Sequence, residues 1–131
     1  MPLKCGDTFL LPKSSKATEH LWIIVTEIDD HTRKAICVNL TTLRNHSDTT
    51  CVLKRGDHPF VVHDSVINFS DAQEMPIDKV EQALAAKTDH FVCKLLDHCD
   101  AGLLARIRQG LLDSRLTPKG IKAQCKRLWG S

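Results

Sequence analysis

The chain has 131 residues, of which 42% are hydrophobic and 26% charged, and its net charge is +2. These values are ordinary for a soluble globular protein, and the length suits one domain that buries its own core. The longest apolar run, residues 21–25, is far shorter than the ~20 residues that span a bilayer. The N-terminus carries no apolar signal segment. We therefore expect a cytoplasmic protein that neither crosses a membrane nor is secreted.

The cysteines indicate the redox state of the chain. Six are present, at positions 5, 37, 51, 93, 99 and 125, and no two have the C-x-x-C spacing. Four of them, at positions 37, 51, 93 and 125, fall inside predicted strands or helices, where a thiol packs as a small apolar side chain. Reduced thiols are therefore expected rather than disulfides.

The first 70 residues alternate between short apolar runs and turns. Runs rich in β-branched residues predict strands over residues 6–11, 20–28, 34–42, 51–54 and 65–69, with a further piece at 61–62. Such closely spaced short strands are typical of a small barrel or sandwich.

Beyond residue 70 the apolar period becomes helical. Helix starts are predicted at Met75-Pro76-Ile77, at Asp100 as an N-cap, and at Thr117-Pro118. A brief apolar run at 90–95 predicts one extra strand. The expected fold class is α+β in a single domain, with a small β-barrel over residues 1–72 and a helical C-terminal extension over 73–131.

The last two predicted helices carry broad apolar stripes. One consists of Leu103, Leu104, Ile107, Leu111 and Leu112, and the other of Ile121, Cys125, Leu128 and Trp129. We expect one helix to cover the barrel and the other to help form a subunit or partner interface. Trp129 is either the anchor of that interface or packs against its own chain.

Polar residues that can do chemistry flank three of the apolar runs. His20 precedes one run, Thr41 and Thr42 close the next, and His58 follows a third on the Gly56-Asp57 turn. Strand ends that close a small barrel bring their flanking residues to one rim. We therefore predict that His20, Thr41 or Thr42, and His58 surround one concavity.

These residue types fit the cleavage of a phosphodiester without metal. That reaction needs a base for the 2′-hydroxyl proton, an acid for the 5′-oxygen, and a donor or cation for the phosphorane charge. Imidazole, whose ordinary pKa is about 6.5, serves as acid or base. The candidate catalytic residues are His20, Thr41, Thr42 and His58. The candidate substrate-binding residues are Lys13, Lys16, Lys54, Arg55 and Ser65, of which the basic ones would contact phosphates unless they form a solvated surface.

Two other site chemistries are weaker alternatives. His90, Cys93, His98, Cys99 and Asp100 include zinc-ligand types, but their spacing matches no standard zinc pattern and core packing is favoured. Cys51 oriented by His20 or His58 would resemble a thiol nucleophile, although no glycine cluster for an oxyanion hole accompanies it. No metal and no cofactor is expected.

About the first 70 residues resemble the PemK/MazF family of toxin endoribonucleases. The resemblance rests on Gly6-Asp7, on the third strand ending in Asn39-Leu40-Thr41-Thr42, on Gly56-Asp57-His58-Pro59-Phe60, and on Ser65-Val66-Ile67-Asn68. The last two motifs are similar to those of a divergent PemK-like branch.

The resemblance implies an SH3-like barrel that dimerises, cleaves single-stranded RNA without metal, and is held inactive by a cognate antitoxin. It places a Ser or Thr of the active site at Thr41 or Thr42. It also places a catalytic arginine at the turn entering the second strand, where this chain has His20.

Two functions follow as hypotheses. The first is an endoribonuclease toxin, and the second is a non-catalytic SH3-like module that binds RNA or a protein partner. Four Phe, two Trp and no Tyr supply few surfaces for base stacking.

Overall fold

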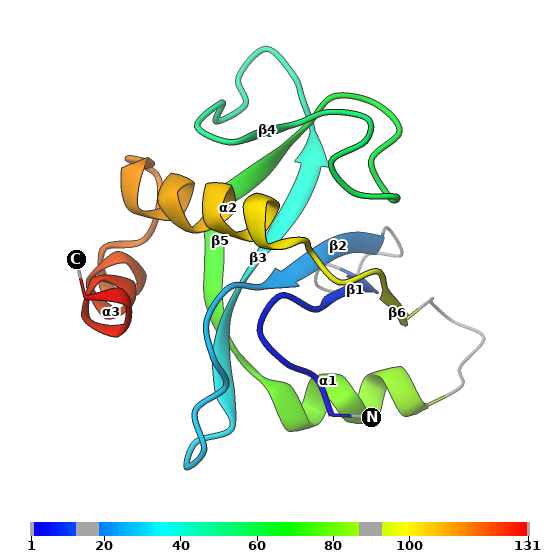
Figure 1. Ribbon diagram of the computed structural model, residues 1–131, viewed down its shortest axis with the longest axis vertical. Coiled ribbons are helices and arrows are strands. Elements are labelled where there is room, and N and C mark those ends of the chain that lie inside the picture. Colours follow the sequence, from blue (N-terminus) through cyan, green and yellow to red (C-terminus); the bar gives the residue numbers. More distant parts are fainter. Residues whose placement is uncertain (1, 13–18, 87–92, 131) are drawn as a thin grey trace.

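The computed structural model describes residues 2–12, 19–86 and 93–130. The elements follow one another as β1 (Thr8–Pro12), β2 (Glu19–Ile24), β3 (Lys34–Thr42), β4 (Val52–Leu53), β5 (Ser65–Pro76), α1 (Ile77–Ala85), β6 (Lys94–Leu96), α2 (Ala101–Asp113) and α3 (Lys119–Trp129) (Figure 1). None of the three helices in the described residues could span a bilayer, since the longest, α2, has 13 residues.

The strands form one antiparallel sheet of six, in the order β4-β5-β3-β2-β1-β6. The long strands β3 and β5 form its spine (Figure 1). Their register shifts between Cys37 and Asn39, and such irregularities bend a strand and increase its twist. The sheet curls into a half-barrel, and with its three helices it confirms the expected α+β class.

Each face of the sheet packs against different helices. Successive side chains of a strand point to opposite faces. In β2, Leu21 and Ile23 belong to the larger core cluster, which also contains residues of α2 and α3. Trp22 and Ile24 belong to a second cluster together with residues of α1. The β2 strand is therefore apolar on both faces because both faces are covered.

The largest differences between the expected and the observed strand bounds lie in three places. β3 spans residues 34–42 as predicted, but β5 continues to Pro76, past the expected change to helix near residue 70. Residues 61–62 lie outside any strand. β2 ends at Ile24 rather than at residue 28, and just beyond it the Thr26 hydroxyl accepts the hydrogen bond from the Ile36 N–H at 2.9 Å. A side-chain oxygen therefore replaces a strand carbonyl at this point.

The structure confirms one of the predicted helix caps, Asp100, and does not confirm another, Thr117. The Asp100 carboxylate accepts a hydrogen bond from the Leu103 N–H at 2.7 Å, so the predicted N-cap of α2 is confirmed. Thr117 does not cap α3, because its hydroxyl donates to the Leu111 carbonyl at 2.8 Å and Pro118 takes the N-cap position. This bond joins the end of α2 to the start of α3.

The helical half of the chain also contributes to the sheet. β6 pairs with β1 through Thr8↔Leu96, Phe9↔Leu95 and Leu10↔Lys94. A strand is thus present at the end of the predicted 90–95 segment, whereas residues 90–92 lie outside the described residues. The sixth strand of the sheet therefore comes from the segment 73–131, which follows the segment expected to form the barrel.

Trp129 packs against its own chain. Its ring contacts the larger core cluster, and the Arg108 guanidinium lies 5.2 Å from the ring centroid, within range of a cation–π interaction. Leu128 points outward instead, with 59% of its surface exposed. Of the two alternatives for Trp129, the contact with its own chain is the observed one, and an interface through α3 stays a prediction.

The close packing of α2 on the sheet gives a test of the fold. A Cβ added at Gly110 would lie 2.7 Å from Cζ of the buried Phe69, whereas one added at Gly120 in α3 would meet nothing within 4 Å. We expect Gly110→Ala to lower the free energy of unfolding by roughly 1–3 kcal/mol, because overpacking outweighs the gain in helix propensity. The matched variant Gly120→Ala should unfold at an equal or higher temperature. Equal melting temperatures for Gly110→Ala and wild type would contradict this packing.

Candidate functional site

A gap in the sheet lies between the ends of β2 and β3. The paired residues of these two strands run from Trp22↔Asn39 to Ile24↔Cys37. On the outer sides, however, β1 pairs with β2 as far as Glu19, and β5 pairs with β3 as far as Thr42. The start of β2 and the end of β3 therefore separate from each other while each keeps its other neighbour.

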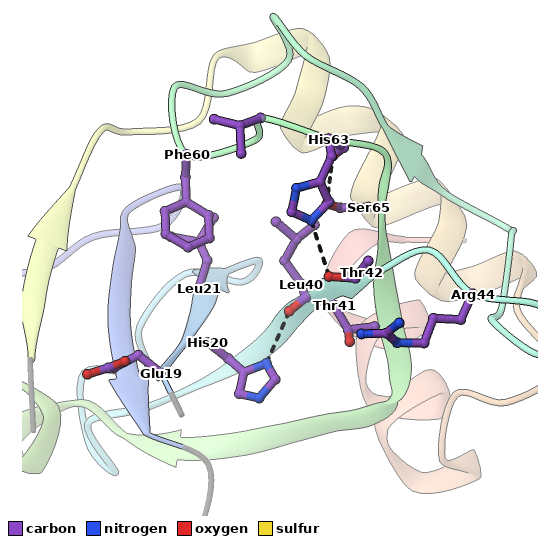
Figure 2. A pocket seen from close by; sticks show the side chains of 11 residues that line it. Glu19, His20, Leu21, Leu40, Thr41, Thr42, Arg44, Phe60, His63 and Ser65 are labelled. Atoms are coloured by element: carbon purple, nitrogen blue, oxygen red, sulfur yellow. Dashed lines mark hydrogen bonds between the residues drawn. The ribbon is translucent and has the colours of Figure 1, made fainter. Parts of the chain in front are cut away.

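A pocket of about 300 Å³ occupies this gap. Its walls come from the start of β2, the end of β3 and the loop before β5 (Figure 2). The residues that line it are Glu19, His20, Leu21, Leu40, Thr41, Thr42, Arg44, Phe60, Val62, His63 and Ser65. We call it the gap pocket. It brings together four residues that the sequence singled out: His20, Thr41, Thr42 and Ser65.

The His20 ring is held by the opposite strand. Its Nδ1 lies 3.3 Å from the Leu40 carbonyl oxygen (Figure 2). A carbonyl only accepts hydrogen bonds, so the proton of the neutral ring is on Nδ1 and the lone pair is on Nε2. The bond thus bridges the two separated strands and leaves Nε2 as the basic nitrogen.

A second histidine, which the sequence analysis did not select, also lines the gap pocket. The His63 Nε2 lies 3.2 Å from the Thr42 hydroxyl (Figure 2). The Ser65 hydroxyl donates to the His63 carbonyl at 3.0 Å and so fixes the turn that carries this ring. Since Thr42 pairs with Ser65, the residue two positions before Ser65 is brought beside Thr42. The placement of His63 depends on this pairing of two distant strands, so the sequence carries no local signal for it.

Arg44 supplies a cation to the same pocket. Its guanidinium points toward Thr41 in Figure 2, and in the described part of the chain it forms no ion pair with a carboxylate. The sequence analysis missed it because it lies just after the end of β3, in a polar loop without periodicity. An arginine without a carboxylate partner is well suited to a phosphate, which it can bind through two parallel hydrogen bonds.

His58 lies elsewhere, so its expected convergence with His20 is not observed. The ring is only 4% exposed, and its Nε2 lies 2.7 Å from the Asp97 carbonyl and 3.2 Å from the Thr8 hydroxyl. Its Nδ1 accepts a hydrogen bond from the Phe60 N–H at 3.1 Å. With both nitrogens bonded inside the protein, His58 joins the loop to β1 and to the segment after β6.

The structural role of His58 predicts a loss of stability on its replacement. His58→Ala removes a buried ring and its hydrogen bonds with the Asp97 carbonyl and the Phe60 N–H, each of which contributes about 0.5–1.5 kcal/mol. Urea unfolding should show this decrease, whereas His31→Ala, an exposed histidine on the turn between β2 and β3, should not. A variant of His58 with unchanged stability and no activity would instead assign His58 to the reaction.

The predicted basic substrate-binding residues that the structure describes lie outside the gap pocket. Lys54 lies 3.8 Å from the Asp64 carboxylate, and Arg55 lines a separate pocket together with His58. Lys13 and Lys16 lie outside the described residues. Among the described residues predicted to bind substrate, only Ser65 lines the gap pocket.

The thiols do not take part in the gap pocket. All six cysteines are unpaired, as expected. Cys51 is buried in the larger core cluster, and burial raises the pKa of its thiol. It faces α2 rather than His20 or His58, so the arrangement of a thiol nucleophile with an imidazole is absent.

The described residues among those considered for zinc likewise form no common site. Cys99 is buried, and burial raises the pKa of its thiol to about 12. The Nδ1 atom of His98 lies 2.9 Å from the Asp7 carboxylate instead. His90 lies outside the described residues, and among those described no three His, Cys, Asp or Glu side chains are grouped closely enough to hold a metal ion.

Comparisons with known proteins assign no family to the chain. No family model matches the sequence, and no curated protein matches it either. The chemistry of the gap pocket therefore carries the functional argument.

Proposed function

We propose that this protein is a cytoplasmic endoribonuclease toxin, similar to PemK and MazF, that cleaves single-stranded RNA without metal in the gap pocket. The observation that carries the proposal is the convergence of two imidazoles, two threonine hydroxyls and a guanidinium in one open pocket. Among the described residues, this guanidinium has no carboxylate partner. These groups come from three separate segments. The curled antiparallel sheet supports an SH3-like barrel as the finer description of the fold.

In this mechanism His20 is the base. Its Nε2 lone pair takes the proton of the ribose 2′-hydroxyl, while the bond from Nδ1 to Leu40 holds the ring and stabilises the imidazolium that forms. The 2′-oxygen then attacks phosphorus and gives a pentacoordinate phosphorane. This step makes the bond that closes a 2′,3′-cyclic phosphate.

His63 is the acid. In the protonated ring both nitrogens donate, so Nε2–H bonds to the Thr42 hydroxyl and Nδ1–H protonates the leaving 5′-oxygen. Breaking of the bond between phosphorus and the 5′-oxygen leaves a 5′-hydroxyl end. The proton taken by His20 and the proton given by His63 balance over one turnover.

Arg44 and the two threonines stabilise the charge of the phosphorane. Donors already placed around a developing anion lower the barrier without reorganisation during the reaction. The resemblance implies a catalytic arginine at the turn entering the second strand, where this chain has His20. In the proposed mechanism Arg44 has the role of that arginine. The cation would thus come from the end of β3 rather than from the start of β2.

The proposal includes regulation by a cognate antitoxin. Phe60 and Val62 are 40% and 62% exposed, and both line the gap pocket. A protein segment that fills the pocket would cover these apolar side chains and exclude RNA. A homodimer is a further part of the proposal, with the exposed Leu128 of α3 available for its interface.

The alternative is a non-catalytic module that binds RNA or a protein partner through the same pocket. It is favoured by one feature, the backbone-bonded His20 at the position where the resemblance expects an arginine. In this case the polar groups would bind a ligand but would not transfer protons.

The two functions are separated by an assay of purified protein with single-stranded RNA in excess EDTA. The toxin hypothesis predicts cleavage to 2′,3′-cyclic phosphate and 5′-hydroxyl ends. The double variant His20→Ala, His63→Ala, purified in the same way, controls for contaminating nucleases and should leave the RNA intact. RNA that is bound by wild type and never cut would establish the binding module.

A further inference from the structure

A second pocket adjoins the gap pocket and has no role in the mechanism above. Its volume is about 380 Å³, and Thr41, Thr42 and Arg44 line both pockets. Its other walls come from the loop after β3, from β5 and from the segment before α3. They include His46, Ser47, Asp48, Asn68, Ser70 and Leu116. We call it the β5 pocket.

We propose that the two pockets form one substrate groove, in which each pocket holds the nucleotide on one side of the scissile phosphate. This inference rests on the proposed function. Both volumes lie near the small end of the range for ligand sites, about 300–1,000 Å³, so each pocket suits a single nucleotide. The shared wall of Thr41, Thr42 and Arg44 lies where the phosphate joining the two nucleotides would pass.

The gap pocket offers an apolar surface for a base. Phe60 and Val62, which are 40% and 62% exposed, line it above the buried Leu21 and Leu40. An aromatic side chain stacks on any base, and each stacked base contributes about 1–3 kcal/mol. The nucleotide in this pocket is therefore held through its base face, with little discrimination of sequence.

The β5 pocket is polar, with the guanidinium of Arg44 at the wall shared with the gap pocket and the carboxylate of Asp48 in the loop after β3. Burial alone would raise the pKa of Asp48, but hydrogen bonds donated by Ser114 and Thr50 bring its pKa below the usual value. The carboxylate is therefore ionised near neutral pH and would repel a phosphate. It can accept a hydrogen bond from the amino group of a base. The base rather than a phosphate therefore enters this pocket, and the phosphate stays at Arg44.

The test uses a deoxyribonucleotide hexamer that contains one ribonucleotide, so that only one bond can be cut. Two further strands lack the base immediately 5′ or 3′ of that bond. In wild type each missing base should lower kcat/KM by about 5- to 100-fold, because each removes one base from a pocket. Cleavage in which either missing base has no effect would overturn the groove while leaving the proposed function intact.

A variant locates the β5 pocket. Ser70→Phe places a large side chain at an exposed position of its wall and should lower kcat/KM for the complete strand by a similar factor. It should have no further effect on the base-deleted strand whose missing base would have occupied the β5 pocket. Gln73→Phe is the matched control, an exposed residue of β5 that lines neither pocket. Equal losses for both base-deleted strands in Ser70→Phe would contradict the assignment of one base to this pocket.

If wild type cuts none of these strands, the proposed function fails and the groove is tested by binding. Fluorescence anisotropy with all-deoxy hexamers should then show weaker binding when either central base is missing. Equal affinity for all three strands would overturn the groove as well.

Discussion

Replacing His63 with alanine should lower the rate of RNA cleavage by about 10²–10⁴-fold, the usual contribution of a positioned general acid or base. The same loss is expected for His20→Ala. Both rings line the open gap pocket and neither lies in a core cluster, so the melting temperatures should stay close to that of wild type. Single-turnover rates and thermal melting, measured on the same preparations, check the two parts of this prediction.

His31→Ala is the matched control for these variants. His31 is exposed on the turn between β2 and β3, outside both pockets of the groove, and its loss should change neither rate nor stability. If His63→Ala cleaved RNA as fast as His31→Ala, His63 would not be the acid.

Arg44→Ala should lower kcat by about 10²–10³-fold, because it removes the cation that faces the phosphorane. KM should change less, since the charge of the phosphate grows in the transition state. Arg44→Lys should recover part of the rate, because an ammonium keeps the charge but loses the two parallel hydrogen bonds. Steady-state kinetics with one short RNA measure all three proteins.

The control for Arg44 is Arg55→Ala. Arg55 carries the same charge but lines a separate pocket with His58, so its removal should have little effect on kcat. Equal losses for the two arginine variants would indicate a general electrostatic effect on RNA binding instead of a role at the phosphate.

Most strands could be predicted from the sequence because apolar β-branched runs carry a strong local pattern. β3 agrees with its prediction at both ends. The second half of β5 carries no such pattern, because Ser70, Gln73 and Glu74 are exposed and polar. It is a strand because it pairs with β3, through contacts such as Ile36↔Glu74. Pairing with a distant strand cannot be deduced from local periodicity.

The candidate site could be predicted in part for the same physical reason. His20, Thr41 and Thr42 end neighbouring strands, so the topology alone brings them together. Which side chain of the loop before β5 joins them depends on tertiary bonds. The bond from His58 to the Asp97 carbonyl, 39 residues further along the chain, holds His58 in the protein and leaves His63 at the pocket.

Two imidazoles share the proton transfers in the proposed mechanism, and the pH dependence of kcat/KM tests this directly. Wild type, His20→Ala and His63→Ala should be measured with one RNA in EDTA between about pH 5 and pH 9, the range in which imidazoles titrate. Wild type should give a bell, because the base must be deprotonated and the acid protonated. His20→Ala should lose the limb that rises with pH, and His63→Ala the limb that falls. A bell of unchanged shape in both variants would contradict the assignment of these two histidines.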